Sequence, residues 1–306
     1  MNIFVRRVIL FQLFFILPYP CLSQELLEPR QWSHLPVNTN FVGAAYAYTE
    51  GNIDFDPVLK IENGQFQMHT WAAKYIRSFA LFEKTARISL LQVYQEGSWV
   101  GLLDGVPTTV KRSGWSDTNL RFVINLYGSP PLQGKEFAAY RAATEVETIV
   151  GTGLSVQLPT GKYLDDKLIN LGTNRFTFRP QFGVVHNWGN WSLETTGLIA
   201  LYTDNNEFII DNKLEQEPLY IIHSHLIYTF RLGVWAGVSA SYDYGGRSTV
   251  NGMSKDDRKQ DVAWAFSFGF PLSRQLGGKI SYIGTRTQEI TGTDSDTLLV
   301  GVSANW

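Results

Sequence analysis

Residues 262–270 read VAWAFSFGF, and this stretch sets the fold of the chain. Its large apolar side chains, from Val262 to Phe270, stand at every second position, and Ala, Ser or Gly fills the positions between them. A period of two is typical of a β-strand, because successive side chains point to opposite faces. The stretch therefore predicts a strand with one strongly hydrophobic face and one face of small side chains.

The same alternation recurs along the chain, for example at 220–230 and 297–306, and helical periodicity is almost absent. It predicts twelve strands, near residues 41–49, 66–77, 85–95, 118–127, 148–158, 174–186, 190–202, 218–230, 232–244, 261–270, 278–288 and 296–306. Short turns alternate with long polar connections at 50–65, 96–117, 159–173, 203–217, 245–260 and 289–295. Short turns at one end and long loops at the other are typical of an outer-membrane barrel.

We therefore expect an all-β fold, a transmembrane antiparallel up-and-down β-barrel of about 12 strands. A soluble β-sandwich would also alternate, but its polar face would carry many charges, whereas here the second face is Gly, Ala, Ser and Thr. Aromatic residues stand at strand ends, at Tyr46, Tyr48, Tyr242, Tyr244 and the terminal Trp306, where an interfacial girdle needs them. These features favour the barrel.

Composition excludes several other classes of protein. The 306 residues are 44% hydrophobic and 18% charged, so the chain is not disordered. The formal net charge of −2 provides no basic field, and we expect no nucleic-acid partner. Beyond the first twenty residues, no apolar run approaches the ~20 residues that a spanning helix requires.

The first 23 residues have the layout of a secretory signal peptide. Arg6 and Arg7 precede an apolar run from Val8 to Leu17, and we expect cleavage after Ser23. Lipid attachment at Cys21 is an alternative that the preceding Pro20 disfavours. The domains are then 1–23, a signal peptide, and 24–306, an outer-membrane barrel. Cleavage removes the only cysteine, so disulfides would not contribute to stability.

One connection at the end of the barrel with the short turns is itself long. Residues 128–147 are long, and KEFAAYRAAT at 135–144 reads as a short helix begun after Pro130 and Pro131. We expect a helical insertion in this periplasmic turn, lying in the periplasm or inside the lumen, and consider it a candidate plug or gate.

If apolar side chains face lipid, the opposite faces supply the lumen. The candidate lumen or constriction residues are Arg77, Arg121, Arg175, Arg179, Glu194, His223 and His225. A mixed ring of this kind could bias which solutes pass. Alternatively, the same side chains pair with one another and fill the interior. Twelve strands lie between the filled eight-stranded barrel and the wide porins, so both readings remain open.

Chemical sites are not evident in the sequence. His223 and His225 share one strand face, but a third metal ligand is missing, so we expect no metal site. Ser224 lies between them and would point to the opposite face, which excludes a serine and histidine pair for hydrolysis. We therefore expect no catalytic residues, no cofactor and no enzymatic activity.

Several runs resemble the outer-membrane family named for the meta-pathway of phenol degradation. They include NFVGAAYAYTEGNIDFDP from residue 40, SGWSDTNLRFVINLYGSPPL from residue 113, LPTGKYLDDKLINLGTNRFTFRPQFGV from residue 158 and EPLYIIHSHLIYTFRLGVWAGVSASYDYGGRSTVNG from residue 217. The resemblance covers almost the whole chain from about residue 36. It implies a single barrel and uptake of hydrophobic or aromatic compounds, and it assigns no functional residues.

The expected function is thus a passive outer-membrane channel for small hydrophobic or aromatic solutes. Its other partners would be outer-membrane lipid, lipopolysaccharide and the barrel assembly machinery. The alternative is a structural or surface-interaction barrel with a filled lumen, whose extracellular loops carry the function.

Overall fold

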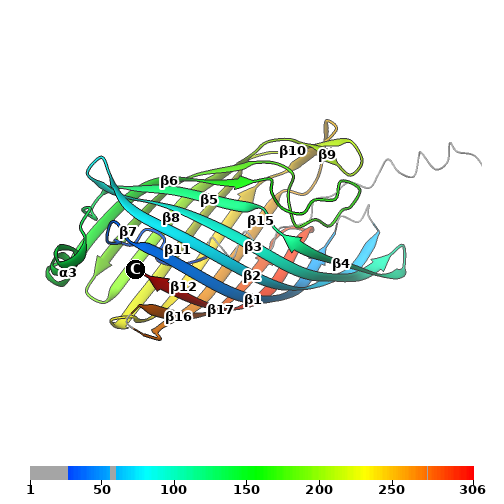
Figure 1. The fold of residues 1–306 in the computed structure, drawn as a ribbon. Helices are drawn as coiled ribbons and strands as arrows, with labels where there is room; N and C mark the ends of the chain where they lie inside the picture. The colour runs from blue at the N-terminus through cyan, green and yellow to red at the C-terminus, as the bar shows by residue number, and fades with distance from the viewer. Residues whose placement is uncertain (1–26, 56–59, 274) are drawn as a thin grey trace, which may run out of the picture.

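A computed structural model describes residues 27–55, 60–273 and 275–306, and its antiparallel strands close into a twelve-stranded β-barrel (Figure 1). The predicted fold class is therefore confirmed. The wall strands are β1 (Asn40–Asp54), β2 (Ile61–Leu81), β3 (Lys84–Leu103), β5 (Thr118–Tyr127), β6 (Val146–Leu158), β7 (Thr177–Trp188), β8 (Trp191–Tyr202), β11 (Leu219–Arg231), β12 (Val234–Gly245), β15 (Lys259–Pro271), β16 (Leu276–Thr287) and β17 (Gly292–Asn305). The first and last strands close the ring, with pairs from Phe41 and Asn305 to Asp54 and Gly292.

Each of the twelve predicted strands is present, but the prediction of a long loop at 96–117 is wrong. Strand β3 continues through this region to Leu103, and β4 (Val106–Trp115) returns along it. Outward positions of this part of the wall carry polar side chains, such as Gln65, Gln67 and Glu96. The hydrophobic alternation that marks a lipid-facing strand is therefore absent where the wall rises into water.

Alternation of the side chains separates the two surfaces of the wall. On β15, the large residues Val262, Trp264, Phe266, Phe268 and Phe270 face outward. The interleaved Ala263, Ala265 and Ser267 face the lumen and are buried. The other wall strands also present apolar side chains to the outside over the lipid-facing part of the wall, as a barrel in lipid requires. Their inward positions carry small and polar residues together with buried apolar ones such as Val123, Ile149 and Val185.

Aromatic rings form a continuous row on the outside of the wall. Tyr46 on β1, Trp71 on β2, Tyr94 on β3 and Trp115 on β4 contact one another in turn, with ring centroids 5.6, 5.9 and 5.3 Å apart. Interfacial aromatic girdles flank the apolar band of membrane barrels. This row therefore marks the outer interface on these strands.

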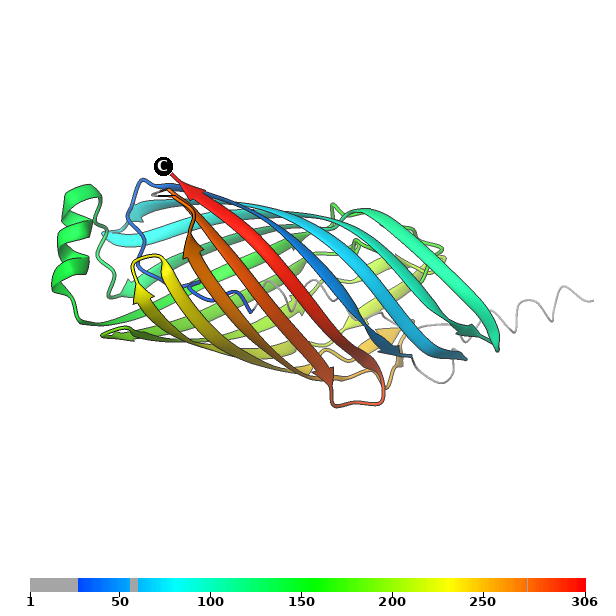
Figure 2. The same cartoon turned by 90° about the horizontal axis from the view of Figure 1, so that it is seen from below.

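The two ends of the barrel differ. At the end with the long loops, β9 (Asn205–Phe208), β10 (Asn212–Gln216), β13 (Ser248–Val250) and β14 (Met253–Ser254) form a second small sheet. At the opposite end lie the C-terminus and α3 (Gly134–Ala143), which extends beyond the wall (Figure 2). The predicted helical insertion is therefore present at the periplasmic end rather than inside the lumen.

No helix in the described part of the chain is long and apolar enough to cross a membrane. The predicted signal peptide at 1–23 lies outside the described residues.

Candidate functional site: the barrel lumen

The N-terminal segment, residues 27–39, runs inside the barrel before β1 begins. Leu27 packs against three lumen-facing residues of β15 and β16, Ala263, Ala265 and Ile283. At the periplasmic end, the backbone N of Val37 donates to Leu132 O at 2.9 Å. A part of the chain that is not wall therefore occupies the periplasmic half of the lumen.

Trp32 lies at the centre of this segment and is fully buried. Its ring packs against Val123, Ile149 and Val185. It also lies on Gly151 and Gly183, which are direct neighbours across β6 and β7. A Cβ at Gly151 would stand 2.6 Å from two ring carbons, and one at Gly183 would overlap the ring. Only glycine at both positions leaves room for the indole.

Polar groups fix the orientation of the Trp32 ring. Its Nε1 donates to Thr196 Oγ1 at 2.8 Å. The Arg121 guanidinium lies over the ring, with Cζ 5.2 Å from the centroid, in the range of a cation–π contact. Arg121 also donates to Gln181 Oε1 from Nε and Nη2, at 3.1 and 2.8 Å.

Two buried charged residues hold the backbone beside Trp32. The Glu194 carboxylate accepts the backbone N–H of Gln31 at 2.8 Å and that of Trp32 at 3.3 Å. Arg87 donates to the carbonyl oxygens of Gln31 and Ser33. Backbone outside helices and sheets that lies inside a barrel must find such partners, because its polar groups have left bulk water. The wall therefore binds the segment through both its backbone and its central ring.

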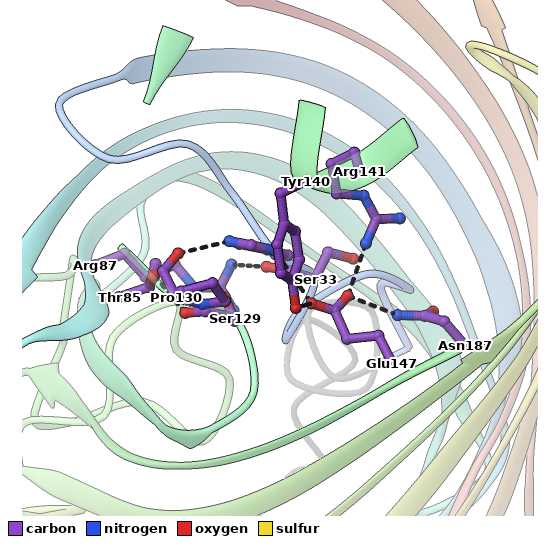
Figure 3. A network of polar contacts seen from close by, with 10 residues as sticks. Ser33, Thr85, Arg87, Ser129, Pro130, Tyr140, Arg141, Glu147 and Asn187 are labelled. Atoms are coloured by element: carbon purple, nitrogen blue, oxygen red, sulfur yellow. Dashed lines mark hydrogen bonds and ion pairs between the residues drawn. The ribbon is translucent and has the colours of Figure 1, made fainter. Parts of the chain in front are cut away.

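Glu147 connects the segment, the wall and α3 at the periplasmic end (Figure 3). Its carboxylate accepts hydrogen bonds from Tyr140 Oη at 3.1 Å, Arg141 Nη1 at 2.7 Å and Asn187 Nδ2 at 3.4 Å. It also lies 3.2 Å from His34 Nδ1, and His34 Nε2 is 2.8 Å from Pro130 O. Helix α3 and its flanking turn thus cover the end of the segment.

Among the predicted lumen residues, Arg121 and Glu194 contact the N-terminal segment directly. His223 and His225 face the lumen from β11 and are buried. His223 Nδ1 lies 2.9 Å from His225 Nε2, and His225 Nδ1 lies 2.7 Å from Ser239 Oγ. Among the residues that the structure describes, no group of three His, Cys, Asp or Glu could hold a metal ion.

Arg175 and Arg179 lie nearer the extracellular mouth. Arg179 donates to Gln157 Oε1 at 2.6 Å and to Asn119 Oδ1 at 3.3 Å. Arg175 donates to Gln216, and its guanidinium lies 4.5 Å from the Tyr202 ring centroid. Both side chains are buried, and Arg179 faces the lumen from β7.

Arg77 does not face the lumen as expected. On β2 the even positions from Gly64 to Ser78 face inward, so Arg77 is in the outward register, where it donates to Asn40 Oδ1 at 3.1 Å. Ser224 also faces outward, as predicted, and lies 2.9 Å from Thr195 Oγ1. The serine therefore does not pair with His223 or His225.

The loop at 159–176 folds over the extracellular mouth. Its Ile169 and Leu171 pack on the inward side chains of Ile53, Phe66 and Met68, together with Trp99. At the base of the loop, Gly161 and Gly172 lie so close that a Cβ on either would stand 2.7 Å from the other residue's backbone. Ile169 and Leu171 of this loop thus join the wall in an apolar cluster at the mouth.

The sequence patterns do not indicate the roles of Trp32, Arg87 and Asp117. Trp32 belongs to a short polar run with no strand pattern, so nothing in the alternation assigns it to the interior. The glycines of GTG at 151–153 did carry a signal, because glycine within a strand marks a bend or a close approach. At Gly151 the approaching group is the Trp32 ring.

The closed twelve-stranded wall, the apolar outside and the internal segment define an outer-membrane β-barrel. The chain belongs to the family described as "Putative MetA-pathway of phenol degradation", whose match spans residues 45–292. The resemblance seen in the sequence is therefore confirmed, and the outer membrane is the location of the protein.

Solved structures share this fold. An outer membrane channel from Pseudomonas putida F1 is 18% identical, with a TM-score of 0.75 over 91% of this chain and 99% of that one. The transport unit of the autotransporter AIDA-I from Escherichia coli is 5% identical, with a TM-score of 0.53 over 92% of this chain and 94% of that one. At these identities the likeness concerns the fold alone. No curated protein matches the sequence significantly.

Proposed function

We propose that the protein is a passive outer-membrane channel for small hydrophobic or aromatic compounds. The observation that carries this proposal is that a separate N-terminal segment, rather than the wall itself, occupies the periplasmic half of the lumen. The periplasmic half of the lumen is occupied by the N-terminal segment, whereas the inward residues of β15 to β17 are mostly small, such as Ala263, Ser267, Ser281 and Ser295. Moving this segment would therefore open the periplasmic half of the lumen without rebuilding the wall.

The apolar mouth supports the class of solute. Phe66, Met68 and Trp99 face inward near the extracellular end, and Ile169 and Leu171 of the loop pack against them. These side chains are buried against one another, and a solute that displaced the loop would meet an apolar surface there, which favours uncharged, poorly hydrated molecules over sugars or ions. The name of the family, which refers to phenol degradation, also agrees with aromatic solutes.

The remaining partners in the proposal follow from the surface. The outward aromatic row and the apolar faces would contact lipid, and the polar wall above them would contact lipopolysaccharide. Strand β17 and the aromatic Trp306 that follows it would be recognised by the barrel assembly machinery. No catalytic step is part of the proposal.

A filled structural barrel is the second candidate, and the fully buried Trp32 and Glu194 favour it. Liposome swelling with the refolded mature chain separates the two, when small aromatic solutes are compared with sugars of similar size. Faster entry of the aromatic solutes is the expected result. A folded, heat-resistant barrel that admits neither class would overturn the channel proposal and favour function in the loops.

A further inference from the structure

The place that Trp32 occupies has the features of a binding site for aromatic molecules. Gly151 and Gly183 form a flat floor, and Val123, Ile149 and Val185 surround the ring. Arg121 covers the ring, with Cζ 5.2 Å from the centroid, and Thr196 Oγ1 accepts a hydrogen bond from the ring edge at 2.8 Å. We call these seven residues the indole slot.

The wall alone builds the indole slot. Its residues belong to β5, β6, β7 and β8, whereas the N-terminal segment contributes only the ring that fills it. The segment is held by non-covalent contacts, chiefly from Glu194 and Arg87. When the segment leaves, the floor, rim, cation and acceptor stay on the wall.

We infer that the indole slot is a solute-binding subsite and that Trp32 occupies it in place of the solute. This inference rests on the proposed channel function and specifies its substrate class. The solute is a flat aromatic molecule of one or two rings with an N–H or O–H donor on its edge. Such a molecule uses all the features of the slot, whereas one without the donor leaves the acceptor of Thr196 unused.

Binding of the solute then competes with binding of Trp32. Because Trp32 is part of the same chain, its effective concentration at the slot is high, on the order of millimolar for a short connection. The solute therefore displaces the segment only when it is abundant. When the solute occupies the indole slot, the segment has left it, and the periplasmic half of the lumen is open.

The first test uses the full mature chain with Trp32→Ala, and indole and N-methylindole as probes. Indole should raise the unfolding temperature of this variant, and N-methylindole should bind about fivefold more weakly, the loss expected for one net hydrogen bond. Adding Gly183→Ala should abolish the indole effect, because the new Cβ fills the slot. Adding Gly301→Ala should preserve it, since a Cβ there meets its nearest neighbour at an ordinary 3.5 Å.

The second test keeps Trp32 in place. With Cys21 in the predicted signal peptide, the Ser33→Cys variant would carry a single thiol in its mature chain. Indole should accelerate modification of this thiol by a polar maleimide, and N-methylindole should do so less. Indole binding to the Trp32→Ala variant with no effect on thiol modification in the Ser33→Cys variant would show that the slot serves Trp32 alone, and would overturn the inference.

Equal effects of both probes, unchanged by Gly183→Ala, would also overturn it. Neither test measures transport, so a barrel that admits no solute in liposomes can still bind indole in the slot. Failure of the inference and failure of the channel proposal are therefore distinguishable.

Discussion

Asp117 holds Thr173 through two hydrogen bonds, from the backbone N at 2.9 Å and from Oγ1 at 2.7 Å, both to Oδ2. The same carboxylate accepts Gln157 Nε2 and the backbone N of Gly161, each at 2.8 Å. Asp117 stands where the chain passes from β4 to β5. One buried carboxylate therefore fastens both ends of the loop that lines the mouth.

Replacing Asp117 by Asn should release this loop. The amide presents a donor where the carboxylate accepted several N–H and O–H groups, and hydrogen bonds to a charged group contribute about 1.5 to 3 kcal/mol each. We expect a lower unfolding temperature and new proteolytic cleavage between 159 and 176. Asp104→Asn is the control, because the ion pair of Asp104 with Lys60 is exposed and should contribute less than about 1 kcal/mol. Unchanged protease resistance of the Asp117 variant would contradict the expectation.

Replacing Glu194 by Ala should weaken the binding of the N-terminal segment to the inside of the wall. The backbone N–H groups of Gln31 and Trp32 lose their acceptor, and each buried unsatisfied group costs about 1 to 3 kcal/mol. We expect lower thermal stability together with a higher conductance in planar bilayers. A variant that loses stability but keeps the wild-type conductance would show that the segment does not limit passage.

Acid should loosen the segment through Glu28. Burial opposes the charged carboxylate, but the ammonium groups of Lys279 and Lys74, at 3.2 and 3.0 Å, outweigh it and hold the pKa of Glu28 well below its usual range. A lowered pKa in the folded state means that the stabilisation is present above the ordinary carboxyl pKa and is lost as the pH falls toward the lowered value.

We therefore expect conductance to rise as the pH falls below about 4, the ordinary range of a Glu carboxyl. Glu28→Gln should remove the part of this rise that belongs to Glu28, and the variant should conduct more at neutral pH. Identical pH profiles for the wild type and the variant would exclude Glu28 as the responsible group.

Arg121→Ala should alter ion selectivity if the lumen conducts. The side chain lies beside the internal segment, so its removal takes a positive charge from the path and should favour cations. Arg286→Ala is the control, because Arg286 faces outward and pairs with Asp296 at 3.0 Å. Reversal potentials across a salt gradient measure the difference. A filled barrel would show lower stability of the Arg121 variant with no conductance to compare.

The sequence predicts the wall well because each lipid-facing strand repeats one physical rule. A strand such as 262–270 must present large apolar groups to lipid and small ones to the lumen, and this requirement is visible in any window of nine residues. Where β3 and β4 rise above the lipid, the outward face meets water and carries polar side chains such as Glu96, so the rule no longer applies. For this reason the sequence predicts a loop at 96–117, whereas the structure has the end of β3 paired with β4 there.

The interior is harder to predict, since its contacts join residues that are distant in sequence. Register alone predicts the inward orientation of Arg121, Arg175, Arg179, Glu194, His223 and His225. Arg77 lies in the outward register instead, because the sequence pattern does not fix which face of β2 is inward. Trp32 and Glu194 are 162 residues apart, and no local pattern connects them.

The position of the N-terminal segment constrains the order of folding. The segment immediately precedes β1, and the ring closes only when β1 meets β17. Asn40 and Trp306 seal the periplasmic end of that seam through two backbone hydrogen bonds, at 3.0 and 3.1 Å. The segment must therefore be enclosed as the seam closes or thread in afterwards from below, and substitutions in the indole slot should change the rate of barrel closure as well as the final stability.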